Sequence, residues 1–145
     1  MKKNLFSVQN KSGFTLIEIM IVLTLLSLIG TFAVRNFMSK DQEGKQKATR
    51  ILIDQIKTSL DDYYRTCGSY PSTAQGGLDA LVKKPADDTC KDYDPSGYLK
   101  KVPKDAWNRD FLYLCDDGKK YVIKSLGRDN KEGGADFDKD ISSED

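Results

Sequence analysis

One long apolar run lies near the start of the chain. Residues 14–34 contain a single formal charge, that of Glu18. A helix made of these residues rises about 1.5 Å per residue and is roughly 31 Å long, which is enough to cross a bilayer. The pattern therefore predicts a membrane-spanning helix over residues 14–34.

Helical periodicity continues beyond this run. Residues 35–66 contain no proline, and their apolar side chains recur every three or four positions, as on one face of a helix. The predicted apolar face consists of Ala48, Leu52, Ile56, Leu60 and Tyr63, flanked by Ile51, Ile53 and Tyr64. Gly68 lies just past the last turn, where glycine often ends a helix. We therefore expect one helix of about 50 residues, whose second half, residues 35–66, packs against a globular head, residues 67–145.

The first part of the head combines a short helix with irregular loops. Ser72 or Thr73 can cap this helix, which ends before Pro85. Residues 86–97 are rich in Asp, Pro, Gly and Ser and are expected to form an irregular loop. Trp107 is interpreted as an anchor in the core.

Two strands are predicted nearer the C-terminus. The runs Phe111–Cys115 and Lys120–Ser125 are rich in β-forming residues, and the Asp-Asp-Gly-Lys segment between them is a turn signal. The residues expected on the shared face of this hairpin are Phe111, Tyr113, Cys115, Tyr121 and Ile123. The predicted fold is α+β, with a long N-terminal helix packed on a small antiparallel sheet.

Composition and charge exclude several classes of function. The formal net charge is +1, and removal of the three lysines in residues 1–13 changes it to −2, so nucleic acid is not expected as a partner. The chain has no histidine, which removes the commonest general base and the commonest zinc ligand. The sequence also has no nucleophile elbow and no phosphate loop. A membrane-anchored enzyme is therefore disfavoured, and no catalytic residue is assigned.

Three cysteines allow one disulfide. In an oxidising compartment, three pairings are open to Cys67, Cys90 and Cys115. The Cys67–Cys90 bridge is preferred because it would tie the end of the long helix to the following loop. Cys115 lies on an apolar strand and can serve as a small buried residue. The absence of any bridge stays an alternative.

The start of the apolar run carries a recognisable motif. Gly13 to Glu18 read Gly-Phe-Thr-Leu-Ile-Glu, and a leader with Lys2, Lys3 and Lys11 precedes them. A charge inside a membrane helix costs on the order of 2.5–3.5 kcal/mol, so Glu18 needs a specific role. The segment resembles the class III signal of type IV pilins and type II secretion pseudopilins.

This resemblance implies roles in processing and assembly. A prepilin peptidase would cut between Gly13 and Phe14, remove the cytoplasmic leader 1–13, and N-methylate Phe14. Glu18 would pair with the terminal amine of a neighbouring subunit and set its register, so that residues 14–34 also serve as a filament core. An ordinary secretory signal peptide explains the segment less well, because the run is too long and no A-x-A-like site follows it. A simple signal anchor leaves Gly13 and Glu18 unexplained.

The C-terminal segment is acidic and glycine-rich. Four aspartates and one glutamate occur between Asp129 and Asp140, together with two glycines. Like charges at this density repel one another unless they are solvated or neutralised by a cation. Their hard oxygen ligands favour calcium over zinc or copper, although the spacing does not match an EF-hand. A merely solvated acidic loop is the alternative.

The same segment resembles the Ser-Leu-Gly-x-Asp-x-x-x-Gly-Gly tail of the major pseudopilin family, whose members hold one calcium ion. The resemblance implies Asp129 and the carbonyl oxygen of Leu126 as ligands. It also implies Asp136 and Asp138 as the closing carboxylates, with Asp140 as a substitute for either.

Two further segments resemble this family, with local departures. Residues 70–81 are similar to its Tyr-Pro-(Ser/Thr)-x-x-Gln-Gly-Leu-x-Ala-Leu segment, with one extra glycine. Residues 97–108 are similar to its Tyr-Leu-x-x-x-Pro-x-Asp-Pro-Trp-Gly box, in which Ala106 and Asn108 replace the usual Pro and Gly. Arg35 also stands where many members carry a proline that kinks or loosens the helix.

Because arginine neither fixes the backbone nor removes an N–H, the weak points of the helix would be Gly30 or Gly44 instead of position 35.

Taken together, the resemblance implies the major structural subunit of the type II secretion pseudopilus. Such subunits polymerise into a helical periplasmic filament that drives export of folded proteins across the outer membrane. The expected partners are other copies of the chain, minor pseudopilins, an inner-membrane assembly platform and the prepilin peptidase. The subunit would cross the inner membrane once, with its N-terminus in the cytoplasm and its head in the periplasm. A type IV pilus subunit used for adhesion, motility or DNA uptake is the alternative.

Overall fold

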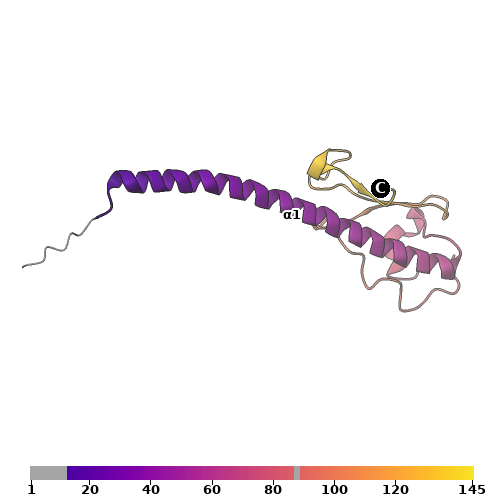
Figure 1. The fold of residues 1–145 in the computed structure, drawn as a ribbon. Helices are drawn as coiled ribbons and strands as arrows, with labels where there is room; N and C mark the ends of the chain where they lie inside the picture. Colours follow the sequence, from indigo (N-terminus) through magenta and orange to yellow (C-terminus); the bar gives the residue numbers. More distant parts are fainter. Residues whose placement is uncertain (1–12, 87–88) are drawn as a thin grey trace, which may run out of the picture. The chain divides into compact units, whose positions relative to one another are not determined.

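A computed structural model describes residues 13–86 and 89–145 of the chain (Figure 1). The elements in chain order are helix α1 (Leu16–Cys67), 3₁₀ helices η1 (Thr73–Gln75) and η2 (Gly77–Leu81), strands β1 (Leu112–Leu114) and β2 (Val122–Ser125), 3₁₀ helix η3 (Asp136–Asp138) and strand β3 (Ile141–Ser142). The predicted α+β fold, a long N-terminal helix with a small antiparallel sheet, is confirmed. Residues 1–12 of the predicted leader lie outside the described residues.

The chain forms two compact units, and the boundary between them falls inside α1, between Ser39 and Lys40. In the first unit the large apolar side chains that the structure describes are exposed on every side of the helix. They include Leu16, Ile17, Met20, Leu23, Leu26, Ile29 and Val34. None of the helices in the described part of the chain is both long enough and apolar enough to cross a membrane.

The second unit, residues 40–145, contains the hydrophobic core. The helical contribution to it is a line of residues that are each at most 2% exposed: Thr49, Ile53, Ile56, Leu60 and Tyr63. The predicted face was partly wrong, because Ala48 is exposed and Leu52 is only half-buried. Ile51 is 67% exposed. The buried line is therefore displaced by one position at its N-terminal end.

Thr49 is the reason for this difference. Its side chain is fully buried, and its Oγ1 accepts a hydrogen bond of 3.2 Å from the backbone N–H of Ala106. A hydroxyl group with a hydrogen-bond partner is tolerated in a core. A pattern based on apolar residues alone does not count it.

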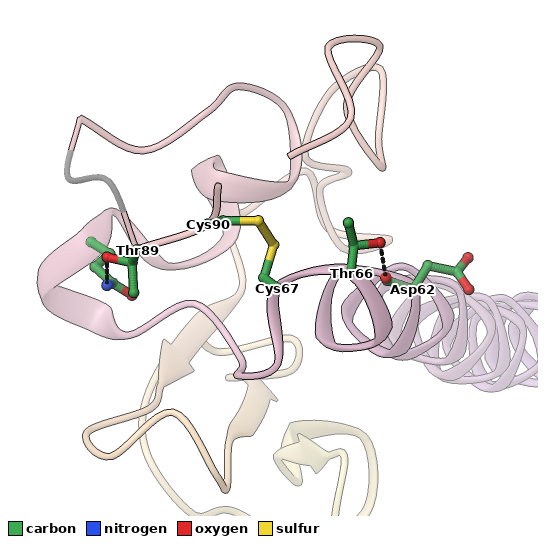
Figure 2. Close-up of a disulfide and its surroundings, with 6 residues drawn as sticks. Asp62, Thr66, Cys67, Thr89 and Cys90 are labelled. Carbon is green, nitrogen blue, oxygen red and sulfur yellow. Dashed lines mark hydrogen bonds between the residues drawn. A yellow bond between two sulfur atoms is a disulfide. The ribbon is translucent and has the colours of Figure 1, made fainter. Parts of the chain in front are cut away.

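The long helix ends at Cys67, and the following residue stops it. Gly68 has a φ of 78°, and its N–H donates to the carbonyl of Tyr64 at 2.8 Å, which is the glycine cap that the sequence predicts. Cys67 forms a disulfide with Cys90, with 4.8 Å between their Cα atoms (Figure 2). The bridge joins the last residue of α1 to the loop after η2. Cys115 is buried and carries a free thiol.

The predicted hairpin is present, and a third strand extends it. Tyr113 of β1 pairs with Ile123 of β2, and Ser125 of β2 pairs with Ile141 of β3, both in antiparallel fashion. Figure 1 shows this sheet beside the C-terminal half of α1. Leu112 and Leu114 of β1 point away from the core and are exposed. Strand β3 was not predicted, because two residues are too few for an alternating pattern to be recognised.

A buried carboxylate ties the loop before β1 to the sheet. One oxygen of Asp105 accepts the backbone N–H groups of Trp107 (3.0 Å) and Arg109 (2.9 Å). The other oxygen accepts the hydroxyl of Ser125 at 2.7 Å. Trp107 packs against the core, as predicted, and its indole N–H donates to Gln42 of α1 at 3.1 Å. This loop is therefore fixed to both the helix and the sheet.

The buried line of α1 predicts a matched pair of substitutions. Ile56→Ala should lower the free energy of unfolding of the fragment 40–145 by about 2–5 kcal/mol, because it leaves a cavity in the core. Ile51→Ala on the same helix should change it by no more than about 0.5 kcal/mol, since that side chain is exposed. Urea denaturation followed by circular dichroism measures both. Equal effects would contradict the assignment of the buried face.

The buried carboxylate predicts a second pair. Asp105→Ala should destabilise the same fragment by about 2–4 kcal/mol, because three donors lose their acceptor inside the protein. Asp110→Ala, whose side chain is 82% exposed, is the control and should have an effect below about 1 kcal/mol. Thermal and urea unfolding give the two values. A destabilisation by Asp105→Ala as small as that of the control would show that this carboxylate does not fix the loop.

Candidate assembly motif and C-terminal loop

The Gly-Phe-Thr-Leu-Ile-Glu motif forms the start of α1. Gly13 and Phe14 precede the helix, and Phe14 is 80% exposed. Thr15 caps the helix, because its Oγ1 accepts the backbone N–H of Glu18 at 3.2 Å. Glu18 lies in the first turn, where the helix dipole favours a negative charge. The bond between Gly13 and Phe14 thus lies in exposed, non-helical backbone just before a capped helix.

Polar side chains in the apolar half of α1 find their hydrogen-bond partners within the helix. Thr24 donates to the carbonyl of Met20 at 2.7 Å, and Ser27 donates to that of Thr24 at 2.8 Å. Thr31 donates to the carbonyl of Ser27 at 2.7 Å. These bonds satisfy the hydroxyl groups without water, so they are compatible with an apolar environment around the helix.

The predicted calcium ligands lie in residues 126–140, which we call the C-terminal loop. Asp129 is exposed, and its carboxylate accepts the backbone N–H of Lys131 at 3.1 Å. Asp136 is also exposed and has a φ of 53°, a left-handed conformation that aspartate tolerates better than most residues. Among the described residues, no three histidine, cysteine, aspartate or glutamate side chains are grouped so as to hold a metal ion. The predicted carboxylate ligands are therefore not brought together in this structure.

The carboxylate of Asp138 is bound by an arginine of the same loop. The Nε and Nη2 atoms of Arg128 donate to its two oxygens at 2.7 Å and 2.9 Å. These hydrogen bonds hold the pKa of Asp138 below its ordinary value and raise the pKa of Arg128. The side chain predicted to close a calcium site is therefore engaged with an internal cation.

Asp140 lies at the end of the loop, and its side chain is more buried than that of Asp138. One oxygen accepts the backbone N–H of Gly133 at 3.1 Å, and the N–H of Asp140 donates back to the carbonyl of Gly133, also at 3.1 Å. Lys124 lies 3.7 Å from the same oxygen. The other oxygen of Asp140 is buried and has no hydrogen-bond partner. The residue that the sequence suggested only as a substitute therefore presents the free buried oxygen.

Two side chains from outside the loop, one in the head and one in α1, hold it in place. The guanidinium group of Arg109 donates to the carbonyls of Gly127 (2.8 Å) and Arg128 (2.9 Å). Gln46 of α1 donates to the carbonyl of Asp136 at 2.8 Å. A shallow hollow between the loop and the helix is lined by Glu43, Gln46, Arg128, Ala135, Asp136, Phe137 and Asp138. Arg109 thus attaches the loop to the rest of the head, and Gln46 attaches it to α1.

Sequence reasoning did not identify Thr15, Gln46, Arg109 or Arg128 in these two regions. Thr15 could have been recognised, because Thr-x-x-Glu before an apolar run is a capping signal. Arg109 and Arg128 could not, because nothing in their local sequence identifies carbonyls or a carboxylate about ten or more positions away as their partners.

Two family models match the chain. Residues 36–144 match the family described as type II secretion system protein G, and residues 8–34 match the prokaryotic N-terminal methylation motif. The second match includes the Gly-Phe-Thr-Leu-Ile-Glu segment. The two matches together extend over almost all of α1 and the head.

Individual relatives agree with these matches. The type II secretion system core protein G of Pseudomonas aeruginosa is 42% identical over 137 residues, which cover 93% of this chain and 96% of the relative. The protein of the same name from Vibrio cholerae is 36% identical, with 93% and 92% covered. The crystal structure of the major pseudopilin from the type 2 secretion system of enterohaemorrhagic Escherichia coli superposes with a TM-score of 0.62 and 27% identity, covering 74% of this chain and 93% of that one. The chain belongs to the type II secretion system protein G family.

Proposed function

We propose that the chain is the major structural subunit of a type II secretion pseudopilus, a filament that drives export of folded proteins across the outer membrane. The family match carries this proposal. The exposed apolar surface of residues 14–34 supports polymerisation, because such a surface is covered by lipid or by other copies of the chain. The role is structural and not catalytic.

Residues 14–34 then have two successive environments. Before assembly they anchor the chain in the inner membrane by a single pass, with the leader 1–13 in the cytoplasm and the head 67–145 in the periplasm. A prepilin peptidase cleaves after Gly13 and N-methylates Phe14. The exposed backbone ahead of the helix and the match to a methylation motif support this step. In the filament, residues 14–34 form the core and residues 35–66 join the core to the heads.

Glu18 sets the position of each subunit along the filament. An apolar core disfavours an unpaired carboxylate, and the terminal amine of Phe14 from a neighbouring copy is a cation of the right charge. A pair of this kind forms only in one register, because no other charge lies within residues 14–34. The remaining partners are minor pseudopilins and an inner-membrane assembly platform.

Calcium is the proposed cofactor of the C-terminal loop. The carboxylates of Asp129, Asp136 and Asp138 and the carbonyl of Leu126 are hard oxygen donors of the kind that calcium prefers. The buried free oxygen of Asp140 also favours a cation nearby. When bound, the ion would crosslink a loop that has little apolar packing of its own. Asp138 takes part only if it releases Arg128.

The filament proposal predicts the effect of Glu18→Ala. In a strain that lacks this chain, exported proteins should remain in the periplasm, and the unmutated gene should restore them to the culture supernatant. Glu18→Ala should not restore them, whereas Asp62→Ala, which removes an exposed acid from the second half of the same helix, should. Supernatant proteomics, with a count of surface fibres, is the measurement. Normal secretion with lost surface fibres would instead indicate a type IV pilus subunit.

The calcium proposal predicts a stability change. Millimolar calcium should raise the melting temperature of the fragment 40–145 relative to EDTA, because an ion that binds only the folded state stabilises it. Asp129→Ala should abolish the increase, whereas Asp92→Ala, an exposed acid outside the loop, should preserve it. Differential scanning fluorimetry gives both values. A melting curve of the unmutated fragment that does not respond to calcium would contradict the site.

A further inference from the structure

The C-terminal loop carries more acidic than basic side chains, and one of its own arginines pairs with an acidic residue of the loop. Residues 126–140 contain five acidic side chains and three basic ones, on a backbone made pliable by three glycines. A calcium ion is one way to neutralise such a segment. In this structure the cation next to the predicted closing carboxylate, Asp138, is the side chain of Arg128 from the same loop.

We propose that Arg128 is an internal cation of the C-terminal loop, which holds Asp138 when no metal ion is bound and competes with calcium for the same oxygens. The competition rests on the calcium site proposed above, whereas the holding role does not. Both oxygens of Asp138 accept from the guanidinium group, at 2.7 Å and 2.9 Å. A two-point contact of this kind fixes the carboxylate more firmly than a single surface ion pair. It also places a positive charge next to the oxygens that a calcium ion would bind, so the two cations would repel one another at Asp138.

The position of Arg128 is itself fixed by the head. Arg109 donates to the backbone carbonyls of Gly127 and Arg128. These hydrogen bonds hold the backbone from which the Arg128 side chain extends. Asp105 in turn accepts the backbone N–H of Arg109 and is anchored on Ser125. The chain of contacts runs from the sheet to the loop. The backbone that carries Arg128 is thus held by hydrogen bonds to the head, which lowers the entropy lost when the pair with Asp138 forms.

The segment that carries Asp138 is also held by contacts with its neighbours. The backbone of Gly134 lies against the carbonyl of Asp138, so closely that no side chain could be placed there. Gln46 of α1 holds the next turn through the carbonyl of Asp136. The pair between Arg128 and Asp138 therefore joins residues near the two ends of the loop. Binding of calcium to Asp138 would exchange one cation for another at this carboxylate.

The test compares three forms of the full chain in detergent micelles: unmutated, Arg128→Ala and Arg65→Ala. Arg65 is the control, because it forms an exposed pair with Asp62 at the far end of α1. Melting temperature is measured in EDTA and during a calcium titration, and amide hydrogen exchange of residues 126–140 is followed in EDTA. Arg128→Ala should melt about 2–6 °C lower than the unmutated chain in EDTA and exchange faster in the loop, while Arg65→Ala should change neither.

The calcium titration separates this proposal from the preceding one. If Arg128 competes, the calcium concentration at half-maximal stabilisation should fall at least about threefold in Arg128→Ala. Unchanged melting and exchange of Arg128→Ala in EDTA would overturn the holding role, and an unchanged calcium midpoint would overturn the competition. A loss of stability in EDTA without any calcium response in either form would support the internal cation while refuting the calcium site.

Discussion

Burial of one face of α1 is the interaction on which the rest of the head depends. Ile53, Ile56, Leu60 and Tyr63 belong to the same buried cluster as residues of η2, β2 and β3. Each such side chain contributes about 1.5–3 kcal/mol when it is removed from water. Strands of three, four and two residues would not persist by themselves, so the sheet exists because the helix supplies the other half of its core. The apolar side chains in the first half of this helix are exposed, whereas its second half is the centre of a folded head.

The features that the sequence predicts well are those decided by local pattern. The extent of α1, its glycine cap at Gly68 and the hairpin all follow from periodicity and turn residues within a short window. The features that it misses depend on a partner far away in the chain. Thr49 is buried because Ala106 donates to it, β3 forms because β2 offers a free edge, and Asp138 is engaged because Arg128 lies opposite. The residue types of the loop predict hard oxygen ligands, but which side chains pair with one another is set by tertiary contacts.

Departures from the family pattern have physical explanations in this structure. Asn108, which replaces the usual glycine of the tryptophan box, has a φ of 64°, and asparagine is one of the few residues that adopt this conformation at low cost. α1 continues without interruption past residue 35, the position at which the resemblance to the family implies a proline in many members. The backbone there retains the N–H that proline would remove.

The alanine at position 106 has a consequence for how this sequence can change over evolutionary time. Its N–H supplies the hydrogen bond to the buried hydroxyl of Thr49, and a proline, the usual residue of the box at that position, has no N–H to give. A proline at position 106 would therefore leave the Thr49 oxygen without this donor inside the core. Conversely, an apolar residue at position 49 would leave the Ala106 N–H without its acceptor. Thr49 and Ala106 are thus coupled across 57 positions of sequence, and substitutions at the two sites should occur together among close relatives.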